Sequence, residues 1–438
     1  MPPLFWSVRV PTRLAIFWRS LFGGKPGGVP RACPRSVIVF RLDAMGDVVM
    51  TTPLFRELKR AFPKSRCTVV VQRTHRPLLA TNPHIEEILT PPEMNSRYLP
   101  RRATKLLAAW LLYWRYLRGR RFDIAISPRW EVDEHLAALL CVLTNATRRV
   151  GYTEKASPLK SRLNRGFDPA FNTCLPAGPV RHEVVRNLAV IEALEGTVKD
   201  SRLDIRLTER DRSFAAQLLA SVPAATKVIA LGIGAASSGR CWPLQRYAEC
   251  VARLARQFHV CPVIVCSAEE REQGMRLEQL LRCRSILLCA APLRQVCAVL
   301  ERCHLFIGND SGAAHLAAAM DCQTIVVSRH PRNGNPNHAN SPLRFAPYCR
   351  EAWVVQPATG LDACTDCCKE SEPHCITAVS VDGVFVAARI MLGDDPAKCH
   401  SQSAEALPRV GGCPELPLVV LTPLPSSVQF GGSREVQG

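Results

Sequence analysis

The chain has 438 residues, enough for two ordinary domains with extensions, and 47% of them are hydrophobic, which permits normal globular cores. The formal net charge of +18 predicts an anionic partner: a phosphate, a nucleic acid or a membrane surface. The sequence has no zinc-finger spacing, aromatic RNA-binding motif or basic leucine zipper, so we expect no nucleic acid partner. It has no run of 18 apolar residues, so we expect no transmembrane helix.

Twenty cysteines are spread through the chain. Several lie inside apolar periodic segments, where a free cysteine packs as a small hydrophobic residue; these are Cys250, Cys261, Cys266, Cys289 and Cys297. Disulfide frameworks are typical of small secreted chains, so this pattern predicts a reducing cytoplasm. We expect the protein to be cytoplasmic, or peripheral on the inner face of the cytoplasmic membrane.

Residues 1–35 contain no acidic residue and end in the Gly/Pro-rich stretch GGKPGGVP. The stretch LFWSVRVPTRLAIFWRSLF mixes aromatic residues with Arg9, Arg13 and Arg19, which is typical of a membrane-surface segment, although Pro11 interrupts it. A disordered basic extension explains the same composition. No small-residue cleavage site stands out, so we predict no signal peptide.

The first regular unit covers residues 36–53. Residues 37–40 (VIVF) predict a strand buried on both faces, and the apolar spacing of residues 54–62 predicts a helix. Between them we expect a polar turn in which Gly46 lets the backbone bend. In open α/β sheets ligands bind outside the carboxyl ends of the strands, so Asp47 lies beside the predicted crevice. Capping of the next helix explains Asp47 equally well.

The first half of the chain continues this alternation. Strands are predicted over residues 67–72, 85–89 and 122–127, and the last of these brings Arg129, Glu131 and Asp133 to the same edge as Asp47. Residues 101–121 predict a strongly basic helix, which is either a crossover helix with a solvated end or a patch that docks on anionic lipid. Helices are also predicted over residues 182–196 and 208–221, and the second of these is the candidate linker.

The pattern then begins again. Strands are predicted over residues 227–232, 263–266, 286–288, 304–308 and 324–327, alternating with helices over 244–258, 293–302 and 313–320. Two successive arrays predict an α/β fold with two Rossmann-like domains facing each other across a cleft. We expect domains at 36–207 and 226–393, a linker at 208–225, a basic extension at 1–35 and a disordered tail at 394–438.

The strongest functional signal is GNDSGAAH, residues 308–315. It leaves a buried strand and starts a helix, where free backbone N–H groups and the positive helix end bind phosphate. Gly308 and Gly312 let a ligand approach the backbone, and Ser311 adds a hydroxyl donor. Asp310 would repel a phosphate, so a sugar hydroxyl is its better partner. An ordinary N-cap at Asp310 or Ser311 is the structural alternative.

The companion loop is GIGAASSGRCWP, residues 232–243. It lacks the third glycine of the dinucleotide fingerprint, which disfavours an NAD-dependent epimerase. Arg240 can neutralise a diphosphate through its fork of donors, whereas Trp242 either contacts the ligand or only packs.

The motifs RLDAMGDVVMTTP, His182 with Arg186-Asn187, Arg-Cys-Trp-Pro and GNDSGAAH together resemble glycosyltransferase family 9, the lipopolysaccharide heptosyltransferase family. The resemblance covers about residues 36–392. It implies a GT-B fold in which the second domain holds an ADP-activated heptose and the first holds the acceptor, with no metal or other cofactor. Residues 328–331 depart from the family's Phe-Gly-Pro-Thr-like turn, and His330 and His338 lie in this segment, which leaves the nucleotide and the sugar open.

The resemblance also implies roles for single residues. Asp47 matches the catalytic base that deprotonates the acceptor hydroxyl for attack with inversion, and Asp43 is the fallback base. Arg240 matches the cation that neutralises the leaving diphosphate, Asp310 matches the donor-sugar contact, and Ser311 with Gly312 matches the β-phosphate donors. The other substrate-binding candidates are Arg41, Gly46, Trp242, Asn309 and His315.

A cysteine cluster near the end of the second array invites a zinc interpretation; it comprises Cys364, Cys367, Cys368, His374 and Cys375. A single cluster without a second Cys-x-x-Cys is a weak signal, so we assign no metal site. We expect an inverting, metal-independent enzyme that transfers heptose from ADP-heptose to an anionic, lipid-linked lipopolysaccharide core acceptor. Two alternatives stay open: another nucleotide sugar or surface-glycan acceptor, and a nucleotide-sugar-binding protein without transfer activity.

Overall fold

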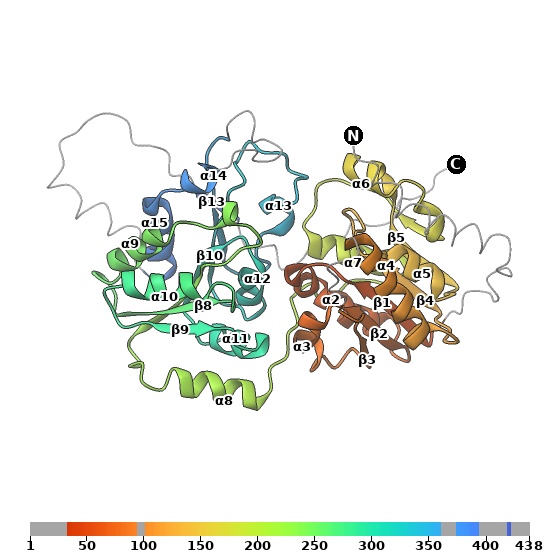
Figure 1. Cartoon of the computed structure of the whole chain (residues 1–438), viewed down its shortest axis with the longest axis horizontal. Coiled ribbons are helices and arrows are strands. Elements are labelled where there is room, and N and C mark those ends of the chain that lie inside the picture. Colours follow the sequence, from red (N-terminus) through yellow and green to blue (C-terminus); the bar gives the residue numbers. More distant parts are fainter. Residues whose placement is uncertain (1–32, 94–100, 361–373, 394–417, 422–438) are drawn as a thin grey trace. The chain divides into compact units, whose positions relative to one another are not determined.

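The computed structural model of the chain describes residues 33–93, 101–360, 374–393 and 418–421, which form two compact units (Figure 1). Unit 1 combines the residues up to Ala220 with Ala291–Val299 and Pro336–Phe345, and unit 2 contains the others. Most of the predicted basic extension and disordered tail, and Cys364, Cys367 and Cys368, lie outside the described residues. The linker and domain boundaries drawn from the sequence stay predictions.

Unit 1 is built on a parallel six-stranded sheet in the order β3-β2-β1-β4-β5-β6. Its strands are β1 (Ser36–Arg41), β2 (Arg66–Val71), β3 (Glu87–Leu89), β4 (Ile124–Ser127), β5 (Arg148–Tyr152) and β6 (Thr173–Leu175). Its helices are α2 (Met45–Ala61), α3 (Arg76–Leu79), α4 (Arg101–Leu112), α5 (Ala137–Leu143), α6 (Pro158–Leu163), α7 (Glu183–Ala193), α8 (Glu209–Leu218), nearly all of α11 (Leu293–Leu300) and α13 (Pro342–Phe345).

Both faces of the unit 1 sheet are covered. Val37 and Val39 of β1 pack on one side with residues of α2 and α7, while Ile38 and Phe40 pack on the other side with residues of α4 and α5. All four side chains are buried. A strand that is covered on both faces is apolar at every position, which is why VIVF shows no alternation.

Helix α2 begins earlier than the sequence pattern predicts. The helix predicted over residues 54–62 is confirmed as far as Ala61, but its predicted start is wrong, because α2 starts at Met45 and continues through Pro53. The predicted turn is correspondingly shorter. Proline has no N–H to donate to the carbonyl of Val49, and the hydroxyl of Thr52 donates to this carbonyl instead, at 2.7 Å. Gly46 therefore lies in the first helical turn and makes no bend.

Unit 2 is built on a seven-stranded sheet in the order β13-β12-β11-β10-β7-β8-β9, in which β13 is antiparallel to β12 and the other pairs are parallel. Its strands are β7 (Lys227–Gly232), β8 (Val260–Cys266), β9 (Ile286–Cys289), β10 (Leu305–Asn309), β11 (Thr324–Val327), β12 (Ala352–Val355) and β13 (Leu418–Leu421). Its helices are α9 (Leu244–Leu254), α10 (Arg271–Leu280), α12 (Gly312–Ala319), α14 (His374–Thr377) and α15 (Val381–Met391). Among the described residues, no helix has the length and hydropathy that crossing a bilayer requires.

Two glycines of unit 2 make room for one aromatic ring. Gly232 and Gly308 are register partners in the adjacent strands β7 and β10. A Cβ atom would lie 2.4 Å from the ring of Phe306 at Gly232 and 2.5 Å from it at Gly308. The missing side chain of Gly308 therefore accommodates Phe306, and the approach of a ligand at this glycine stays a prediction.

Candidate active site

The carboxyl edge of the unit 1 sheet holds a cluster of two acids and two arginines. Arg41 ends β1 with a fully buried side chain, and its guanidinium lies 3.1 Å from Asp47 and 3.4 Å from Asp43. Arg129 follows the neighbouring strand β4, and its guanidinium lies 3.2 Å from Asp47 and 3.5 Å from Asp43. Burial lowers the pKa of Arg129, but the charges of Asp43 and Asp47 outweigh burial and the pKa is raised. Each carboxylate thus contacts two cations.

Asp47 does not cap helix α2. The N-cap of α2 is Ala44, without a side-chain cap, and Asp47 stands in the first turn, where a negative charge is favourable to the helix dipole. One carboxylate oxygen pairs with Arg41 and the other with Arg129, and the side chain is 10% exposed. An acid fixed from two sides and still accessible can accept a proton from a hydroxyl placed beside it. The assignment of Asp47 as the base stays a prediction.

The three polar residues predicted to reach this edge have different partners, and Glu131 pairs with Arg344. Arg129 lies at Asp47, as predicted. Asp133 accepts hydrogen bonds from the backbone N–H groups of Ala137 at 3.1 Å and Ala138 at 2.9 Å, so it caps the start of α5. Its carboxylate is therefore committed to the fold.

Two further basic residues of this edge, half-buried His75 and buried Lys160, were not predicted from the sequence. Burial lowers the pKa of His75, and the charges of Asp47 and Asp43 offset this in part. Lys160 of α6 donates to the backbone carbonyl of Arg129 at 3.0 Å, and burial lowers its pKa to about 8. Lys160 therefore fixes the backbone of the residue that holds Asp47. Neither residue belongs to a motif, so the sequence offers no signal for them.

Trp130, next to Arg129, packs against two guanidinium groups. The guanidinium carbons of Arg186 and Arg344 lie 3.7 Å and 4.6 Å from its ring centroid. Glu183 accepts from both arginines, at 2.8 Å and 2.7 Å, and Arg344 also pairs with Glu131. This Trp130 cluster, which is buried apart from partly exposed Glu131, fixes the loop that follows β4.

The motif of His182 with Arg186-Asn187 attaches α7 to the rest of unit 1. The ring of His182 caps α7 by accepting from the backbone N–H of Val184 at 3.2 Å. The side chain of Asn187 donates to the backbone carbonyl of Met50 in α2 at 3.0 Å. In unit 1 this motif therefore has a structural role.

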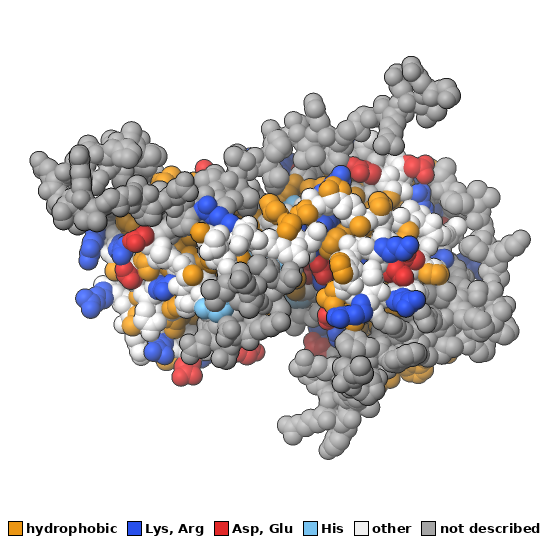
Figure 2. Space-filling view, turned by 90° about the horizontal axis from the view of Figure 1, so that it is seen from above, with side chains coloured by type: hydrophobic (Ala, Val, Ile, Leu, Met, Phe, Trp, Pro, Cys, Tyr) orange, Lys and Arg blue, Asp and Glu red, His pale blue; other side chains and the backbone are white. Residues whose placement is uncertain are grey.

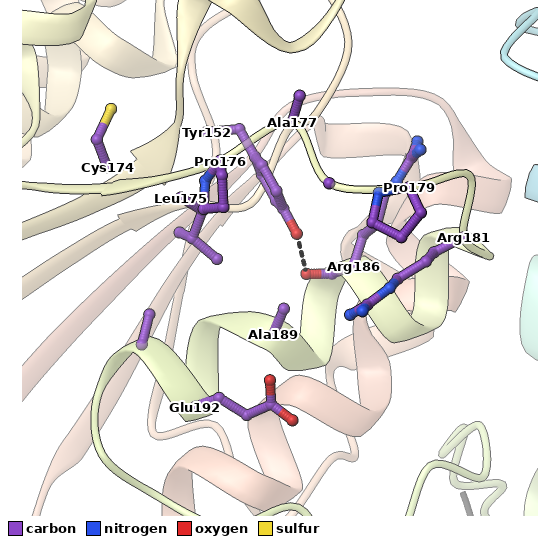
Figure 3. Close-up of a pocket in the computed structure, with 12 residues that line it drawn as sticks. Tyr152, Cys174, Leu175, Pro176, Ala177, Pro179, Arg181, Arg186, Ala189 and Glu192 are labelled. Atoms are coloured by element: carbon purple, nitrogen blue, oxygen red, sulfur yellow. Dashed lines mark hydrogen bonds between the residues drawn. The ribbon is translucent and has the colours of Figure 1, made fainter. Parts of the chain in front are cut away.

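A pocket of about 390 Å³ opens at the same edge, between the ends of β5 and β6 and helix α7. Figure 3 shows Tyr152 pointing towards α7, where its hydroxyl donates to the backbone carbonyl of Arg186 at 2.8 Å. Most of the lining is apolar, from Leu175, Pro176, Ala177, Pro179, Ala189 and Ala193, whereas Arg181 and Glu192 supply charges. Such a pocket can hold an apolar or sugar-ring surface next to an anionic group.

In unit 2, the end of β10 and the start of α12 form a second candidate site. Ser311 occupies the N-cap position of α12 but makes no side-chain cap, and its Oγ is buried without a hydrogen-bond partner among the described residues. The first N–H groups of a helix, here those of Gly312 and Ala313, have no partner within the helix. These donors converge at the positive helix end, which suits a phosphate. His315, also predicted to bind substrate, is buried within α12.

Arg240 and Asp310 form an ion pair at this site. The guanidinium of Arg240, from the loop after β7, lies 2.6 Å from the carboxylate of Asp310, and both side chains are partly exposed. The pair balances the negative charge of Asp310, so a phosphate at the start of α12 would not face an isolated carboxylate.

Asn309 and Trp242 use their polar atoms inside the protein. The Oδ1 atom of Asn309 accepts from the backbone N–H of Trp242 at 2.9 Å and from the hydroxyl of Tyr247 at 3.1 Å, while its Nδ2 donates to the carbonyl of Ile233 at 2.7 Å. The indole of Trp242 donates to the carbonyl of Val379 at 3.0 Å. Both side chains are buried, which supports a role in shaping the loop rather than in touching a ligand.

Glu270 adds an acid to this edge that no motif marked. A Cβ atom at Gly234 would lie 2.0 Å from a carboxylate oxygen of Glu270, so Gly234 leaves the space that Glu270 occupies. The other oxygen accepts from the backbone N–H of Ser267 at 2.9 Å. A carboxylate held in this way can accept hydrogen bonds from the hydroxyl groups of a ligand.

The described residues contain no group of three or more His, Cys, Asp or Glu side chains that could hold a metal ion. His374 and Cys375 lie in α14, where the thiol and the imidazole Nδ1 are 3.2 Å apart. The other members of that cysteine cluster lie outside the part of the chain that the structure describes.

Two curated relatives match most of the chain. Lipopolysaccharide heptosyltransferase 1 of Pseudomonas aeruginosa is 27% identical over 380 residues, which are 81% of this chain and 98% of that protein. The lipopolysaccharide core heptosyltransferase OpsX of Haemophilus influenzae is 22% identical over 325 residues, which are 72% and 82% of the two chains.

Solved structures agree in fold. A glycosyltransferase of family 9 from Veillonella parvula superposes with a TM-score of 0.66 at 21% identity, covering 82% of this chain and 97% of its own. The ADP-heptose lipopolysaccharide heptosyltransferase II of Escherichia coli superposes with a TM-score of 0.58 at 18% identity, covering 82% and 98%. The predicted fold class, a two-domain α/β fold of the GT-B type, is therefore confirmed.

The family match covers part of each sheet. The model of glycosyltransferase family 9 (heptosyltransferase) matches residues 110–336, more than half of the chain. The matched range includes Arg129 and Trp130 of unit 1 and Arg240 and Asp310 of unit 2. On this match the protein is a glycosyltransferase, and the chain belongs to glycosyltransferase family 9, the heptosyltransferase family.

Proposed function

We propose that the protein transfers heptose from ADP-heptose to a lipopolysaccharide core acceptor, with inversion at the anomeric carbon and without a metal ion. The sugar and the acceptor are those that the names of its relatives carry. The acceptor is anionic and lipid-linked, so the enzyme works in the cytoplasm at the inner face of the membrane.

The observation that carries the proposal is the position of Asp47. Its carboxylate stands at the carboxyl edge of the sheet and is held by Arg41 and Arg129; the residue is buried, but 10% of its side-chain surface is exposed. In the proposed reaction Asp47 removes the proton from the acceptor hydroxyl while the hydroxyl oxygen attacks the anomeric carbon, and the bond to the diphosphate breaks. Asp43 has the same two cations as partners and is the fallback base.

The donor belongs to unit 2 in this proposal. The N–H groups at the start of α12 and the Ser311 hydroxyl bind the β-phosphate, which is supported by the uncapped helix start. Arg240 neutralises the leaving diphosphate, and Asp310 contacts the donor sugar after exchanging its partner Arg240 for the ligand. Asn309 and Trp242 keep the loop that carries Arg240 in shape.

The acceptor belongs to unit 1. We assign the pocket beside Arg181 to part of the acceptor, because it opens at the same sheet edge as Asp47 and offers a cation beside an apolar wall. The buried Trp130 cluster keeps the loop of Arg129 in place while the acceptor binds.

The test is the Asp47→Asn variant. It should lower the transfer rate by about 10²–10⁴-fold, the usual contribution of a general base, while the affinity for ADP-heptose changes little. The transfer rate of the Asp43→Asn variant should fall less, because Asp47 stays in place. Transfer is measured from ADP-heptose to a truncated core lipopolysaccharide, and donor binding is measured by calorimetry.

Asp321→Asn supplies the matched control, because this carboxylate is exposed in unit 2 and its positive φ suits asparagine. Transfer by Asp47→Asn at the rate of the control would refute the assignment of the base. Thermal shifts with ADP-heptose, UDP-glucose and GDP-mannose identify the donor, because a bound ligand stabilises the folded state in proportion to the logarithm of its concentration. A shift with a UDP or GDP sugar and none with ADP-heptose would overturn the proposed donor.

A further inference from the structure

Helix α4 and the π-helical segment that continues it, Tyr113–Leu117, carry two exposed tryptophans. Trp110 is 54% and Trp114 is 44% exposed, and no other tryptophan is exposed among the described residues. Their ring centroids are 5.7 Å apart, one helical turn along the same side. The opposite side is buried in the core through Ala109, Leu112 and Leu117. The helix is therefore anchored on its inner face, and its aromatic face is left open.

This open face is also positively charged. Figure 2 shows basic, acidic and hydrophobic side chains mixed over the face that it presents. Residues 101–121, in contrast, contain seven basic residues and no acid. Lys105 and Arg120 have acidic partners in Glu134 and Glu87, at 3.7 Å and 2.6 Å.

Three of the arginines have charges that no acidic side chain of the described residues neutralises. Arg115, Arg118 and Arg121 are exposed and form no ion pair with an acid in the described part of the chain. The guanidinium of Arg118 lies over the ring of Trp114, 4.0 Å from its centroid. Arg118 and Trp114 thus form one surface with Trp110, and the exposed Arg115 and Arg121 lie next to it in the chain. We call these five residues the outer face of α4.

The chemistry of this surface fits a lipid headgroup layer better than a nucleic acid. Bases stack on free aromatic faces, but one face of Trp114 is covered by Arg118, and Trp110 is tilted by 54° against it. Tryptophan indoles prefer the interface between hydrocarbon and water, and arginines bind phosphates there. A helix with these two residue types on its outer side lies along a membrane surface and does not cross it.

We propose that the outer face of α4 docks the protein on an anionic lipid bilayer. Trp110 and Trp114 enter the headgroup region, while Arg115, Arg118 and Arg121 contact lipid phosphates. The inference deepens the proposed function, on which its meaning rests, because it names the surface by which the enzyme reaches a lipid-linked acceptor. Vesicle binding involves no sugar transfer, so it can be tested separately.

The experiment is flotation of the full chain with vesicles of phosphatidylcholine alone or mixed with phosphatidylglycerol. The wild type should float with the mixed vesicles and much less with phosphatidylcholine. Trp110→Ser/Trp114→Ser should lose most of this binding, and Arg118→Gln/Arg121→Gln should bind about 25-fold more weakly, at roughly fivefold for each arginine. Higher salt should weaken vesicle binding by the wild type and should have little effect on vesicle binding by the arginine variant.

Two variants in unit 2 are the matched controls. Met275→Ser removes an exposed hydrophobic side chain, 48% exposed, and Arg256→Gln removes an exposed arginine. Both should float like the wild type. Circular dichroism and melting curves check that every variant is folded; should the tryptophan variant fail this check, the arginine variant decides alone, since its side chains are fully outside the core.

The result that would overturn the proposal is equal flotation of wild type, tryptophan variant and arginine variant. Such a result would assign any vesicle binding to another part of the chain, for example residues 1–32. Loss of flotation in the controls as well would also overturn it, because the binding would then be unspecific. Both α4 variants should keep the wild-type transfer rate on a detergent-dispersed acceptor, whereas failure of the proposed function would remove transfer from the wild type itself.

Discussion

Replacing Arg344 by methionine should strongly destabilise unit 1. Arg344 is fully buried; it donates to Glu183 at 3.0 Å and 2.7 Å, pairs with Glu131, and lies over the ring of Trp130. Methionine keeps much of the volume but removes the charge. Removing one partner of a buried ion pair costs about 3–5 kcal/mol, because the other charge is left without compensation.

The structure indicates which carboxylate suffers most. Glu183 keeps Arg186 as a partner at 2.8 Å, so its charge stays balanced. Glu131 loses Arg344, the one cation for which it has an ion pair within the described residues, and its side chain is only 14% exposed. We therefore expect a loss of about 3 kcal/mol, near the lower end of the range. For a unit of roughly 200 residues this corresponds to a fall of about 6–12 °C in melting temperature.

Two further variants separate charge from packing. Arg344→Lys keeps the cation but not the planar guanidinium, so its melting temperature should lie between those of the wild type and Arg344→Met. Arg344→Met/Glu131→Gln removes the stranded charge as well and should recover part of the loss. The difference between the double variant and the sum of the single ones gives the coupling energy between the two residues.

The assay is differential scanning calorimetry of the full chain, in which the two units can show separate transitions. Arg344→Met should lower the temperature of one transition, and Asp321→Asn should leave that transition unchanged. We assign this transition to unit 1. A melting curve of Arg344→Met within about 1 °C of the wild type would refute the reasoning, because it would mean that the pair contributes less than about 0.5 kcal/mol. No recovery by Glu131→Gln would refute the part assigned to the stranded charge.

Three more predictions follow from buried groups. Asn309→Ala should lower the free energy of unfolding, measured in urea, by about 1–3 kcal/mol and weaken donor binding, since it leaves the buried Trp242 N–H without an acceptor; unchanged stability would contradict this. Burial lowers the pKa of Lys160 from 10.5 to about 8. Between these pH values the unfolded state binds more protons, so the stability of the wild type relative to Lys160→Met should rise with pH, by on the order of 3 kcal/mol; a constant difference in melting experiments at pH 7.5 and 10 would speak against it. Gly308→Ala should lower the free energy of unfolding by about 1–3 kcal/mol, because the new Cβ meets the ring of Phe306, and the additional change Phe306→Leu should recover this loss. Lost donor binding at full stability would instead favour the approach of a ligand at Gly308.

Strands with a continuous apolar run were predictable. The bounds of β7 and β11 match the predicted ranges residue for residue, because both runs are fully apolar inside and end at turn residues. Strand β5 was missed because its sequence, RRVGY, begins with two arginines. Arg149 is nevertheless buried, and its guanidinium donates to the backbone carbonyl of Ala170 at 2.7 Å. Only the tertiary structure provides that acceptor, so no local pattern could indicate the strand.

The same limit applies to the candidate site. The position of Arg129 beside Asp47 was predictable, because both follow neighbouring parallel strands and such ends share an edge. The pairing of Arg344 with Glu183 was not, since the two residues are 161 positions apart and Arg344 lies in no motif. The start of α2 was not predictable because of Pro53, which normally ends a helix and here is accommodated by the Thr52 hydroxyl.

The discontinuous composition of unit 1 affects how the protein is made. Its last segment, Pro336–Phe345, is synthesised after most of unit 2. At the usual speed of translation, about 5–20 residues per second, roughly 6–25 s pass between residue 220 and residue 345. During this time Glu183 and Glu131 are without Arg344 as a partner. The N-terminal part of unit 1 is then incomplete and is exposed to chaperones and proteases. A gene fragment that stops at residue 220 should therefore yield a poorly folded product, whereas one that extends past Phe345 supplies the missing cation.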